Sequence, residues 1–234
     1  MHTATDLDAV TVVLPALDEA EALPAALASF PAGVDLLVVD NGSTDATAAV
    51  ATALGARVVS EPRRGFGAAC WAGVLASPQA EVIAFADADG SLDGADLAAV
   101  AGPVLAGEAD LVIGSRVTGG REPGALSPVA LAANRTIGLA CRLLFGVPLS
   151  DLGPFRAIRR ADLLALGVRD RGSGWPLEMV GRAGRAGLRV VEVPVCYRRR
   201  AGGRSKVSGS LRGSAGAVRA MTGVALRLAA EPVP

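Results

Sequence analysis

Two aspartates separated by one residue, Asp87 and Asp89, follow the apolar run 82–86. Alternate side chains of an extended segment lie on the same side, so the two carboxylates face the same way. Like charges this close are costly unless a cation lies between them, and hard divalent cations prefer oxygen ligands. We therefore predict that Asp87 and Asp89 bind Mg²⁺ or Mn²⁺. The ion would neutralise charge on a departing diphosphate, which makes Asp89 a candidate catalytic residue.

Two other acidic loops follow apolar runs in the same way. Residues 15–19 close the first apolar run of the chain, and residues 40–45 close the second. The carboxyl ends of parallel strands meet at one edge of a sheet, where ligands bind in open α/β folds. Asp-rich turns are also ordinary helix caps, which is the simpler explanation for any one of these loops. Three such loops together indicate a binding site at a single edge.

The elements that must position these loops alternate between short β-rich runs and helical patterns, which predicts an α/β, Rossmann-like core with a mostly parallel sheet covered on both faces. Strands are expected over 10–14, 34–39, 57–59, 82–86 and 111–113, and helices over 21–30, 45–54 with Ser43 or Thr44 as N-cap, 68–75 and 95–105. After Gly114 come a Gly/Pro-rich loop over 118–128, helices around 131–144 and 211–228, and shorter elements between them. Neither a dinucleotide-binding nor a P-loop glycine motif is present, so the sequence lacks the residues expected of either class of nucleotide-binding protein.

The composition fits one compact domain. Of the 234 residues, 51% are hydrophobic but only 3% aromatic, so the core is expected to consist of small aliphatic side chains and the chain is not a disordered one. We find neither an uninterrupted apolar stretch of about 18 residues nor a signal-peptide pattern, and therefore expect a cytoplasmic protein, with peripheral contact at the inner face of the membrane as an option. Cys70, Cys141 and Cys196 lie in apolar contexts, which predicts buried, reduced thiols.

The charges are sorted along the chain although the formal net charge is zero. Residues 1–112 carry 16 acidic and 3 basic side chains, whereas residues 113–234 carry 7 and 20. This sorting favours an acidic region for a cation and a basic region for phosphates. The sequence contains no nucleic-acid-binding module, and the acidic half would repel a duplex, so we expect no nucleic-acid partner.

The ordered motifs carry a family resemblance, which covers about residues 10–207. They read VLPxxDE, VDNGSTD, RGxG, DADGS and GSR, followed by DLGPFR from Asp151, then Glu178, EVPV from Glu192 and GRSK from Gly203. The first set resembles the GT-A family-2 glycosyltransferases, and the later set resembles their dolichol- or polyprenyl-phosphate mannose synthase branch. The resemblance implies a single GT-A domain over 1–207, with a nucleotide- and metal-binding half (1–114) and an acceptor half (115–207). A C-terminal amphipathic helix and tail would occupy 208–234.

The resemblance also implies roles for particular residues. Donor binding falls on Pro15, Glu19, Asp40, Arg64, Gly65, Asp87 and Asp89. Binding of the acceptor phosphate falls on Arg116, Arg135, Arg156, Arg204 and Lys206. Three positions depart from the family pattern. Asp18 replaces a frequent Asn and Asn41 a usual Asp, which leaves the base open between GDP- and UDP-sugars, and Ser91 replaces a Gln that often contacts the metal.

The remaining candidates have two interpretations each. Glu178 and Asp151 would serve as general base if the acceptor were a hydroxyl, whereas a phosphate needs none. The run 198–200 fits either a solvated face or phosphate binding, and the helix at 211–228 either packs on the domain or lies on a membrane.

The expected function is metal-dependent, inverting transfer of a sugar from a nucleotide-diphosphate sugar to a polyprenyl phosphate or another phosphate-bearing acceptor. The alternatives are a transferase with a soluble hydroxyl acceptor and a non-catalytic nucleotide-sugar-binding protein.

Overall fold

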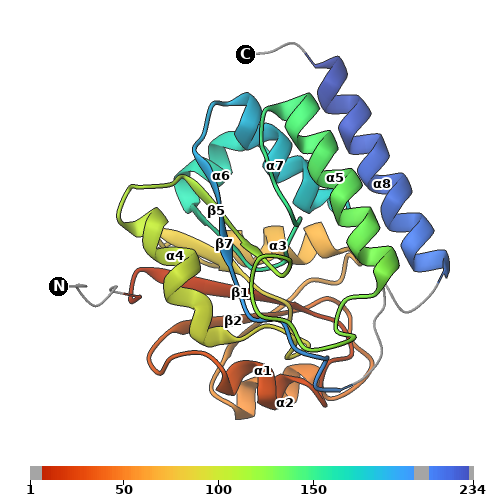
Figure 1. Cartoon of the computed structure of the whole chain (residues 1–234). Coiled ribbons are helices and arrows are strands. Elements are labelled where there is room, and N and C mark those ends of the chain that lie inside the picture. Colours follow the sequence, from red (N-terminus) through yellow and green to blue (C-terminus); the bar gives the residue numbers. More distant parts are fainter. Residues whose placement is uncertain (1–6, 203–210, 232–234) are drawn as a thin grey trace.

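A seven-stranded sheet forms the centre of the computed structural model, which describes residues 7–202 and 211–231, and helices cover both of its faces (Figure 1). The strand order is β3-β2-β1-β4-β6-β5-β7. Strand β6 is antiparallel to both of its neighbours, and every other pair is parallel. The strands are β1 (Val10–Ala16), β2 (Asp35–Asp40), β3 (Arg57–Ser60), β4 (Val82–Phe85), β5 (Leu111–Ser115), β6 (Arg156–Arg159) and β7 (Val190–Pro194).

Two helical layers enclose the sheet. One layer consists of α1 (Leu23–Ala28), α2 (Thr47–Ala53) and α4 (Leu97–Leu105), the last preceded by the 3₁₀ turn η1 (Gly94–Asp96). The other consists of α3 (Phe66–Leu75), α5 (Pro128–Phe145), α6 (Arg160–Leu166), α7 (Trp175–Arg185) and α8 (Leu211–Ala230). Among the described residues, we find no helix that combines the length and hydrophobicity needed to span a bilayer.

Alternation along the strands explains why both faces need a cover. In β1, Val12 and Leu14 contribute to the core beneath α1, α2 and α4, whereas Val13 contributes to the core beneath α3 and α7. All three side chains are fully buried. A strand that buries both faces must be apolar throughout, which is the pattern that the sequence shows.

The α/β class and the elements of the first half are confirmed, with shifted boundaries. The predicted N-cap of the second helix is wrong, because α2 begins at Thr47 with Ala46 at the N-cap. Ser43 and Thr44 instead bind the loop after β1: the Ser43 hydroxyl accepts from Asp18 N at 2.9 Å, and Thr44 N donates to the Asp18 carboxylate at 2.7 Å.

The prediction for the cysteines is correct for two of the three. Cys70 and Cys141 are free and buried, but Cys196 is free and exposed. Cys196 follows the end of β7, and its backbone N donates to the Asp96 carboxylate at 2.6 Å. The apolar residues around it in the sequence gave a misleading signal, because Val195 takes the buried position of this pair.

Candidate active site

The carboxyl ends of β1, β2 and β4 bring the three acidic loops to one edge, as predicted. The first two loops are tied together by hydrogen bonds. Besides the contacts of Asp18, which has a positive φ of 51°, Glu19 N donates to the Thr47 hydroxyl at 2.8 Å and Asn41 N donates to Ala16 O at 2.8 Å. A non-glycine residue with positive φ is uncommon and needs local support, which the loop after β2 supplies. Pro15 is the penultimate residue of β1 and lies opposite Val39.

Asn41 organises the neighbouring loop that contains Arg64 and Gly65. Its amide donates to Glu61 O and Arg63 O, both at 2.9 Å, and its carbonyl oxygen accepts from Gly65 N at 2.8 Å. Gly65 has a φ of 148°, and a Cβ there would lie 2.2 Å from Arg171 O, so only glycine fits. Asp40 accepts from Ser43 N at 3.0 Å. An aspartate at position 41 could accept but not donate, which explains the departure from the family pattern in local terms.

Asp87 and Asp89 lie beyond the end of β4, with different surroundings. No hydrogen bond to the Asp87 carboxylate is found among the described residues, and burial together with the charge of Asp89 raises its pKa, although Arg116, Arg156 and Arg200 act in the opposite direction. Both oxygens of the Asp89 carboxylate accept a hydrogen bond. Its Oδ1 accepts from Ser91 N at 2.9 Å, and its Oδ2 accepts from Arg200 Nη1 at 3.0 Å.

The carboxylate pair fits a divalent cation of the kind that works with diphosphates. No three His, Cys, Asp or Glu side chains in the described part of the chain gather closely enough to bind a metal by themselves. Mg²⁺ in nucleotide sites needs only one or two carboxylates, because substrate phosphates and waters complete its coordination. Burial and, to a smaller extent, the charge of Asp89 raise the pKa of Asp87, and a cation between the two carboxylates would favour their charged forms.

Arg200 is the main site residue that the sequence analysis left unresolved. The segment Tyr197–Gly202 runs along the loop after β4: Arg198 N donates to Ser91 O at 2.7 Å, and Ala201 N donates to Asp89 O at 3.0 Å. From this segment Arg200 pairs with both Asp89 and Glu19. The three adjacent arginines diverge, because Arg198 pairs with Asp93 and Arg199 donates to Pro123 O. A run of identical residues gives no signal as to which one faces the site.

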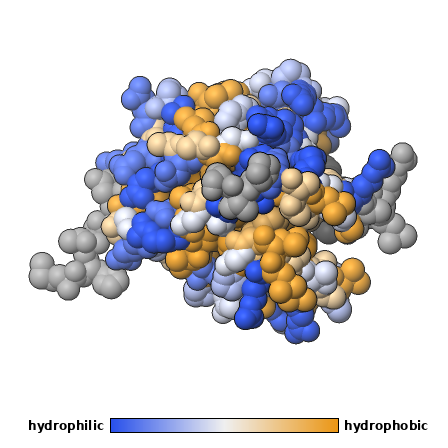
Figure 2. Space-filling model, turned by 90° about the horizontal axis from the view of Figure 1, so that it is seen from above, coloured by the Kyte–Doolittle hydropathy of each residue, from blue (hydrophilic) through white to orange (hydrophobic). Residues whose placement is uncertain are grey.

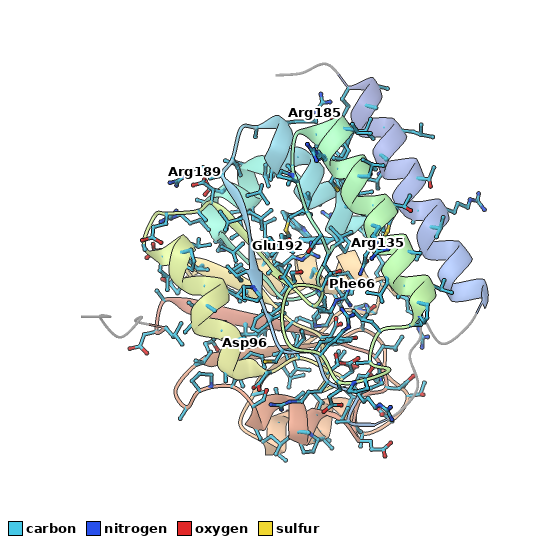
Figure 3. The ribbon with its side chains drawn as sticks, in the orientation of Figure 1. Phe66, Asp96, Arg135, Arg185, Arg189 and Glu192 are labelled. Carbon is cyan, nitrogen blue, oxygen red and sulfur yellow. The ribbon has the colours of Figure 1, made fainter. Side chains whose placement is uncertain are left out.

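Arg116 is held at the end of β5 by a buried carboxylate. Its Nε and Nη2 donate to the two oxygens of Asp151 at 2.7 and 2.8 Å, and its backbone N donates to the same carboxylate at 2.9 Å. Asp151 is fully buried. Glu192 of β7, labelled in Figure 3, in turn accepts from the backbone N of Ser150 and Asp151. The guanidinium also lies over the Tyr197 ring, 5.1 Å from its centroid. This chain of contacts fixes Arg116 close enough to Asp87 to act on its pKa.

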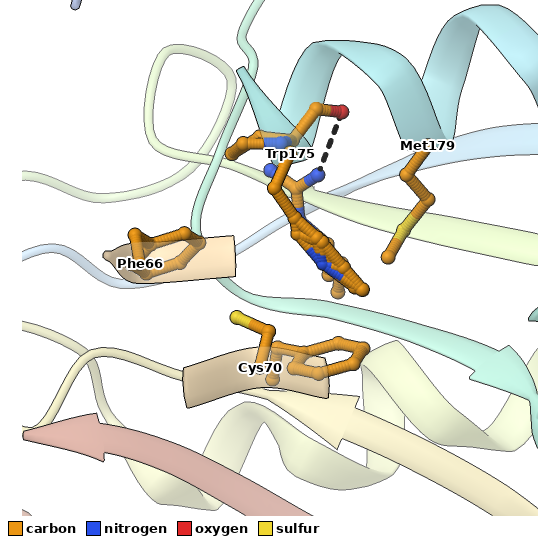
Figure 4. Close-up of a pocket in the computed structure, with 7 residues that line it drawn as sticks. Phe66, Cys70, Trp175 and Met179 are labelled. Atoms are coloured by element: carbon orange, nitrogen blue, oxygen red, sulfur yellow. Dashed lines mark hydrogen bonds between the residues drawn. The ribbon is translucent and has the colours of Figure 1, made fainter. Parts of the chain in front are cut away.

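Arg156 lies in the interior rather than on an open acceptor surface. It is 4% exposed, and its guanidinium donates to Pro176 O at 3.2 Å and to Gly153 O. Burial lowers its pKa to about 10. A cavity of about 10 Å³, room for about one water, lies beside it. Its lining, shown in Figure 4, comprises Phe66, Cys70, Phe85, Arg156, Trp175, Pro176 and Met179.

Glu178 is buried in the first turn of α7 and binds two groups. It pairs with Arg182 at 2.8 Å and accepts from Asp170 N at 2.6 Å. Burial alone would raise the pKa of Glu178, but these hydrogen bonds lower it below its usual value. Glu178 thereby fixes the loop before α7, whose Arg171 stacks on Trp71 with its guanidinium carbon 4.7 Å from the ring centroid.

The other predicted binding residues, of the donor and of the acceptor, are more dispersed. Arg135 is exposed on α5 (Figure 3), and Arg64 is exposed with its guanidinium donating to Gly42 O at 2.9 Å. Arg204 and Lys206 lie outside the described residues.

Several known proteins are similar to this chain in sequence and in fold. A family model described as glycosyl transferase family 2 matches residues 11–166. An uncharacterised glycosyltransferase of Mycobacterium tuberculosis is 52% identical over 209 residues, which are 88% of this chain and 93% of that protein. The polyprenol monophosphomannose synthase of Mycolicibacterium smegmatis is 34% identical over 218 residues, covering 85% of this chain and 81% of that protein.

A solved structure is similar throughout. Glucosyl-3-phosphoglycerate synthase from Mycobacterium tuberculosis, crystallised with Mn²⁺, UDP and glucosyl-3-phosphoglycerate, aligns with a TM-score of 0.74 and 27% identity over 95% of this chain and 80% of that chain. The family model covers most of the chain, and the acidic loops lie at the carboxyl edge of a mostly parallel sheet. This protein therefore belongs to glycosyl transferase family 2.

Proposed function

We propose that this glycosyltransferase uses a divalent cation to move a sugar, with inversion, from a nucleotide-diphosphate sugar to the phosphate of a polyprenyl phosphate. The observation that carries the proposal is the juxtaposition of Asp87 and Asp89 with Arg116, which Asp151 holds from the acceptor half of the chain. This arrangement supports a cation site and an anionic-acceptor site beside each other, as transfer between two phosphates requires.

The donor side is supported by the loops that bind one another. Pro15, Glu19, Asp40 and the Arg64-Gly65 turn would surround the nucleoside, and Asp87 and Asp89 would hold the cation. The cation, when bound, supplies positive charge to the departing diphosphate. Fixed donors and charges that do not need to reorganise during the reaction are an effective source of rate enhancement.

A phosphate acceptor is supported by the contacts of Asp151 and Glu178, the two candidate general bases. The acceptor oxygen would attack the anomeric carbon as the bond from that carbon to the diphosphate breaks, and the bonding electrons leave with the nucleoside diphosphate. A hydroxyl would have to lose a proton, but both oxygens of Asp151 bind Arg116, and Glu178 binds Arg182 and Asp170 N. A phosphate is already anionic, so these carboxylates are free to act as positioning groups. Of the Arg116 nitrogens, Nη1 does not face Asp151 and would meet the acceptor phosphate.

The polyprenyl nature of the acceptor is supported by relatives and by the surface. Besides the mycobacterial synthase, the undecaprenyl-phosphate mannosyltransferase of Micrococcus luteus is 32% identical over 228 residues. Helices α5 and α8 contain no acidic residue. Exposed apolar side chains occur on both helices, namely Val129, Leu139, Leu143, Leu144, Val218 and Leu226. Figure 2 shows hydrophobic and hydrophilic residues side by side on the face of the molecule seen from above. An apolar and basic surface fits peripheral contact with an anionic membrane.

A second candidate is transfer to a small soluble acceptor that carries a phosphate. The observation in its favour is the similarity to the synthase crystallised with phosphoglyceric acid, which aligns over 95% of this chain. Arg116 would then bind the phosphate of the acceptor without that phosphate being the nucleophile.

One experiment separates these functions. The purified protein is incubated with Mn²⁺ and either UDP-, GDP- or dTDP-sugars, in the presence of undecaprenyl phosphate or of phosphoglycerate, and products are identified by mass spectrometry. We expect a sugar-phosphate lipid whose formation stops in EDTA. Arg116→Gln should abolish it, whereas Arg57→Gln, which breaks a surface ion pair on β3, serves as the matched control. A product found only with phosphoglycerate would favour the second candidate, and donor binding without any product would favour a non-catalytic role.

A further inference from the structure

Each nitrogen of the Arg200 guanidinium donates a hydrogen bond at the proposed cation site. Nη1 donates to Asp89 Oδ2 at 3.0 Å, Nη2 pairs with Glu19, and Nε donates to Gly202 O at 2.7 Å. The side chain is only 20% exposed. One positive charge is therefore shared between two carboxylates at the edge of the sheet, in a planar arrangement that suits arginine.

Both oxygens of Asp89 thus accept a hydrogen bond, and Oδ2 accepts it from the charged guanidinium. The other oxygen, Oδ1, accepts from Ser91 N at 2.9 Å. A divalent cation that binds Asp89 must approach a guanidinium of like charge, so the two positive groups compete for this carboxylate. The backbone donor is fixed in the turn after Asp89, whereas the arginine side chain has several rotatable bonds. Arg200 is therefore the group that would give way.

We infer that Arg200 competes with the divalent cation for Asp89, so that cation binding is weak until a nucleoside diphosphate binds. This inference rests on the proposed function and deepens it. The diphosphate offers anionic oxygens with which Arg200 pairs after leaving Asp89. Nucleotide and cation thus strengthen each other's binding, and the coupling is reciprocal by thermodynamic linkage. Arg200 acts here as a positioning residue that sets the order of binding.

The side chain can move without its segment. The backbone of residues 197–202 is held independently by Arg198 N to Ser91 O at 2.7 Å, by Ala201 N to Asp89 O at 3.0 Å and by a bridge between Leu92 and Tyr197. Arg198 provides a matched control, because it lies in the same segment but pairs with Asp93 instead of Asp89.

The test measures Mn²⁺ binding by electron paramagnetic resonance without nucleotide. Arg200→Gln removes the charge-assisted hydrogen bond to Asp89, so this variant should bind Mn²⁺ about tenfold more tightly than wild type. Arg200→Lys, which retains the charge, should stay near wild type, and so should Arg198→Gln. Addition of UDP should tighten Mn²⁺ binding to wild type by a larger factor than to Arg200→Gln. Arg200→Met, which keeps much of the length of the side chain, repeats the test if the glutamine variant fails to fold.

The outcomes separate this inference from the function on which it rests. If wild type and Arg200→Gln bind Mn²⁺ equally without nucleotide, Arg200 is not a competitor, and Mn²⁺ binding in the presence of UDP would still uphold the proposed cation site. If none of the proteins binds Mn²⁺ even with UDP, the cation site of the proposed function and the inference are both rejected.

Discussion

The proposed donor and acceptor sides of the site are built in different ways. On the donor side, each loop is held by the loop after the neighbouring parallel strand, as in the contact of Asp18 with Thr44. On the acceptor side, Arg116 depends on Asp151, which lies 35 residues later, and the backbone of Asp151 depends on Glu192, which lies 41 residues later still. The donor side thus follows from the regular sheet, whereas the acceptor side depends on a few long-range charged contacts. The two sides should respond differently to substitution.

The largest effect is expected on the donor side from Asp89→Asn. Loss of one negative charge should remove Mn²⁺-dependent donor binding and lower turnover by about 10³-fold or more, because charge stabilisation on the leaving group is lost. Thermal unfolding should change little, since Asp89 lies at the rim. Calorimetric titration of the donor with Mn²⁺ checks this, with Asp93→Asn in the same loop as control. Full turnover of the variant, or of wild type in EDTA, would contradict the cation site.

Asp151→Asn should instead affect stability. It leaves Arg116 without its buried partner, and breaking such a pair by removing one member costs about 3–5 kcal/mol. Urea unfolding measures this loss, and acceptor affinity should fall more than donor affinity. The single-turnover rate at saturating substrates should stay within about tenfold of wild type, because a phosphate nucleophile needs no base.

The single-turnover rate of Glu178→Gln provides a comparison with that of Asp151→Asn. Glu178 also lies in an ion pair, with Arg182, so its loss should disturb the loop before α7 and spare the chemical step. A fall of about 10² to 10⁴ in the single-turnover rate for either variant, with binding of both substrates intact, would indicate a general base and hence a hydroxyl acceptor.

Asn41→Asp should have a smaller effect, confined to the donor side. It removes two donated hydrogen bonds, to Glu61 O and Arg63 O, each of which contributes about 0.5–1.5 kcal/mol to stability. The turn at Gly65 should loosen, and nucleotide affinity should fall several-fold without a change in acceptor affinity. Parallel titrations of UDP and of the acceptor test this separation. Equal losses for both substrates would show that the two sides are not independent.

The smallest effect is expected for Asp110 and Arg189, an exposed pair that joins the acidic and basic halves. Hydrogen bonds from Arg189 lower the pKa of Asp110 to about 2. A depressed pKa means that the pair stabilises the fold above the usual aspartate pKa near 4, and that this contribution disappears as the pH falls towards 2. Solvent screening keeps the contribution small. Urea midpoints of Asp110→Asn and wild type should differ slightly at pH 6 and converge near pH 2.

The same contrast explains what could be predicted from sequence. Asp87 and Asp89 were predictable because a polar pair directly after a buried strand can only lie at the edge of the sheet. The role of Asp151 as a partner of Arg116 was not, because the sequence does not indicate that β6 enters the sheet between β4 and β5. Arg200 was ambiguous for a similar reason. Its partners Glu19 and Asp89 lie 181 and 111 residues away, beyond the range of any local pattern.

The position of β6 also constrains how the chain can fold. Strands β4 and β5 are consecutive in the sequence, yet they are not neighbours in the sheet, because β6 pairs with both. A nascent chain that ends at residue 114 therefore contains most of β5 but no strand that can pair with it. Contacts of such large sequence separation form slowly, since the intervening chain must first be ordered. Synthesis must pass residue 159 before β6 can join β4 to β5, residue 194 before β7 completes the sheet, and residue 200 before Asp89 can pair with its arginine. The halves suggested by charge and motifs are consequently parts of one cooperative unit, and neither is expected to fold when expressed alone.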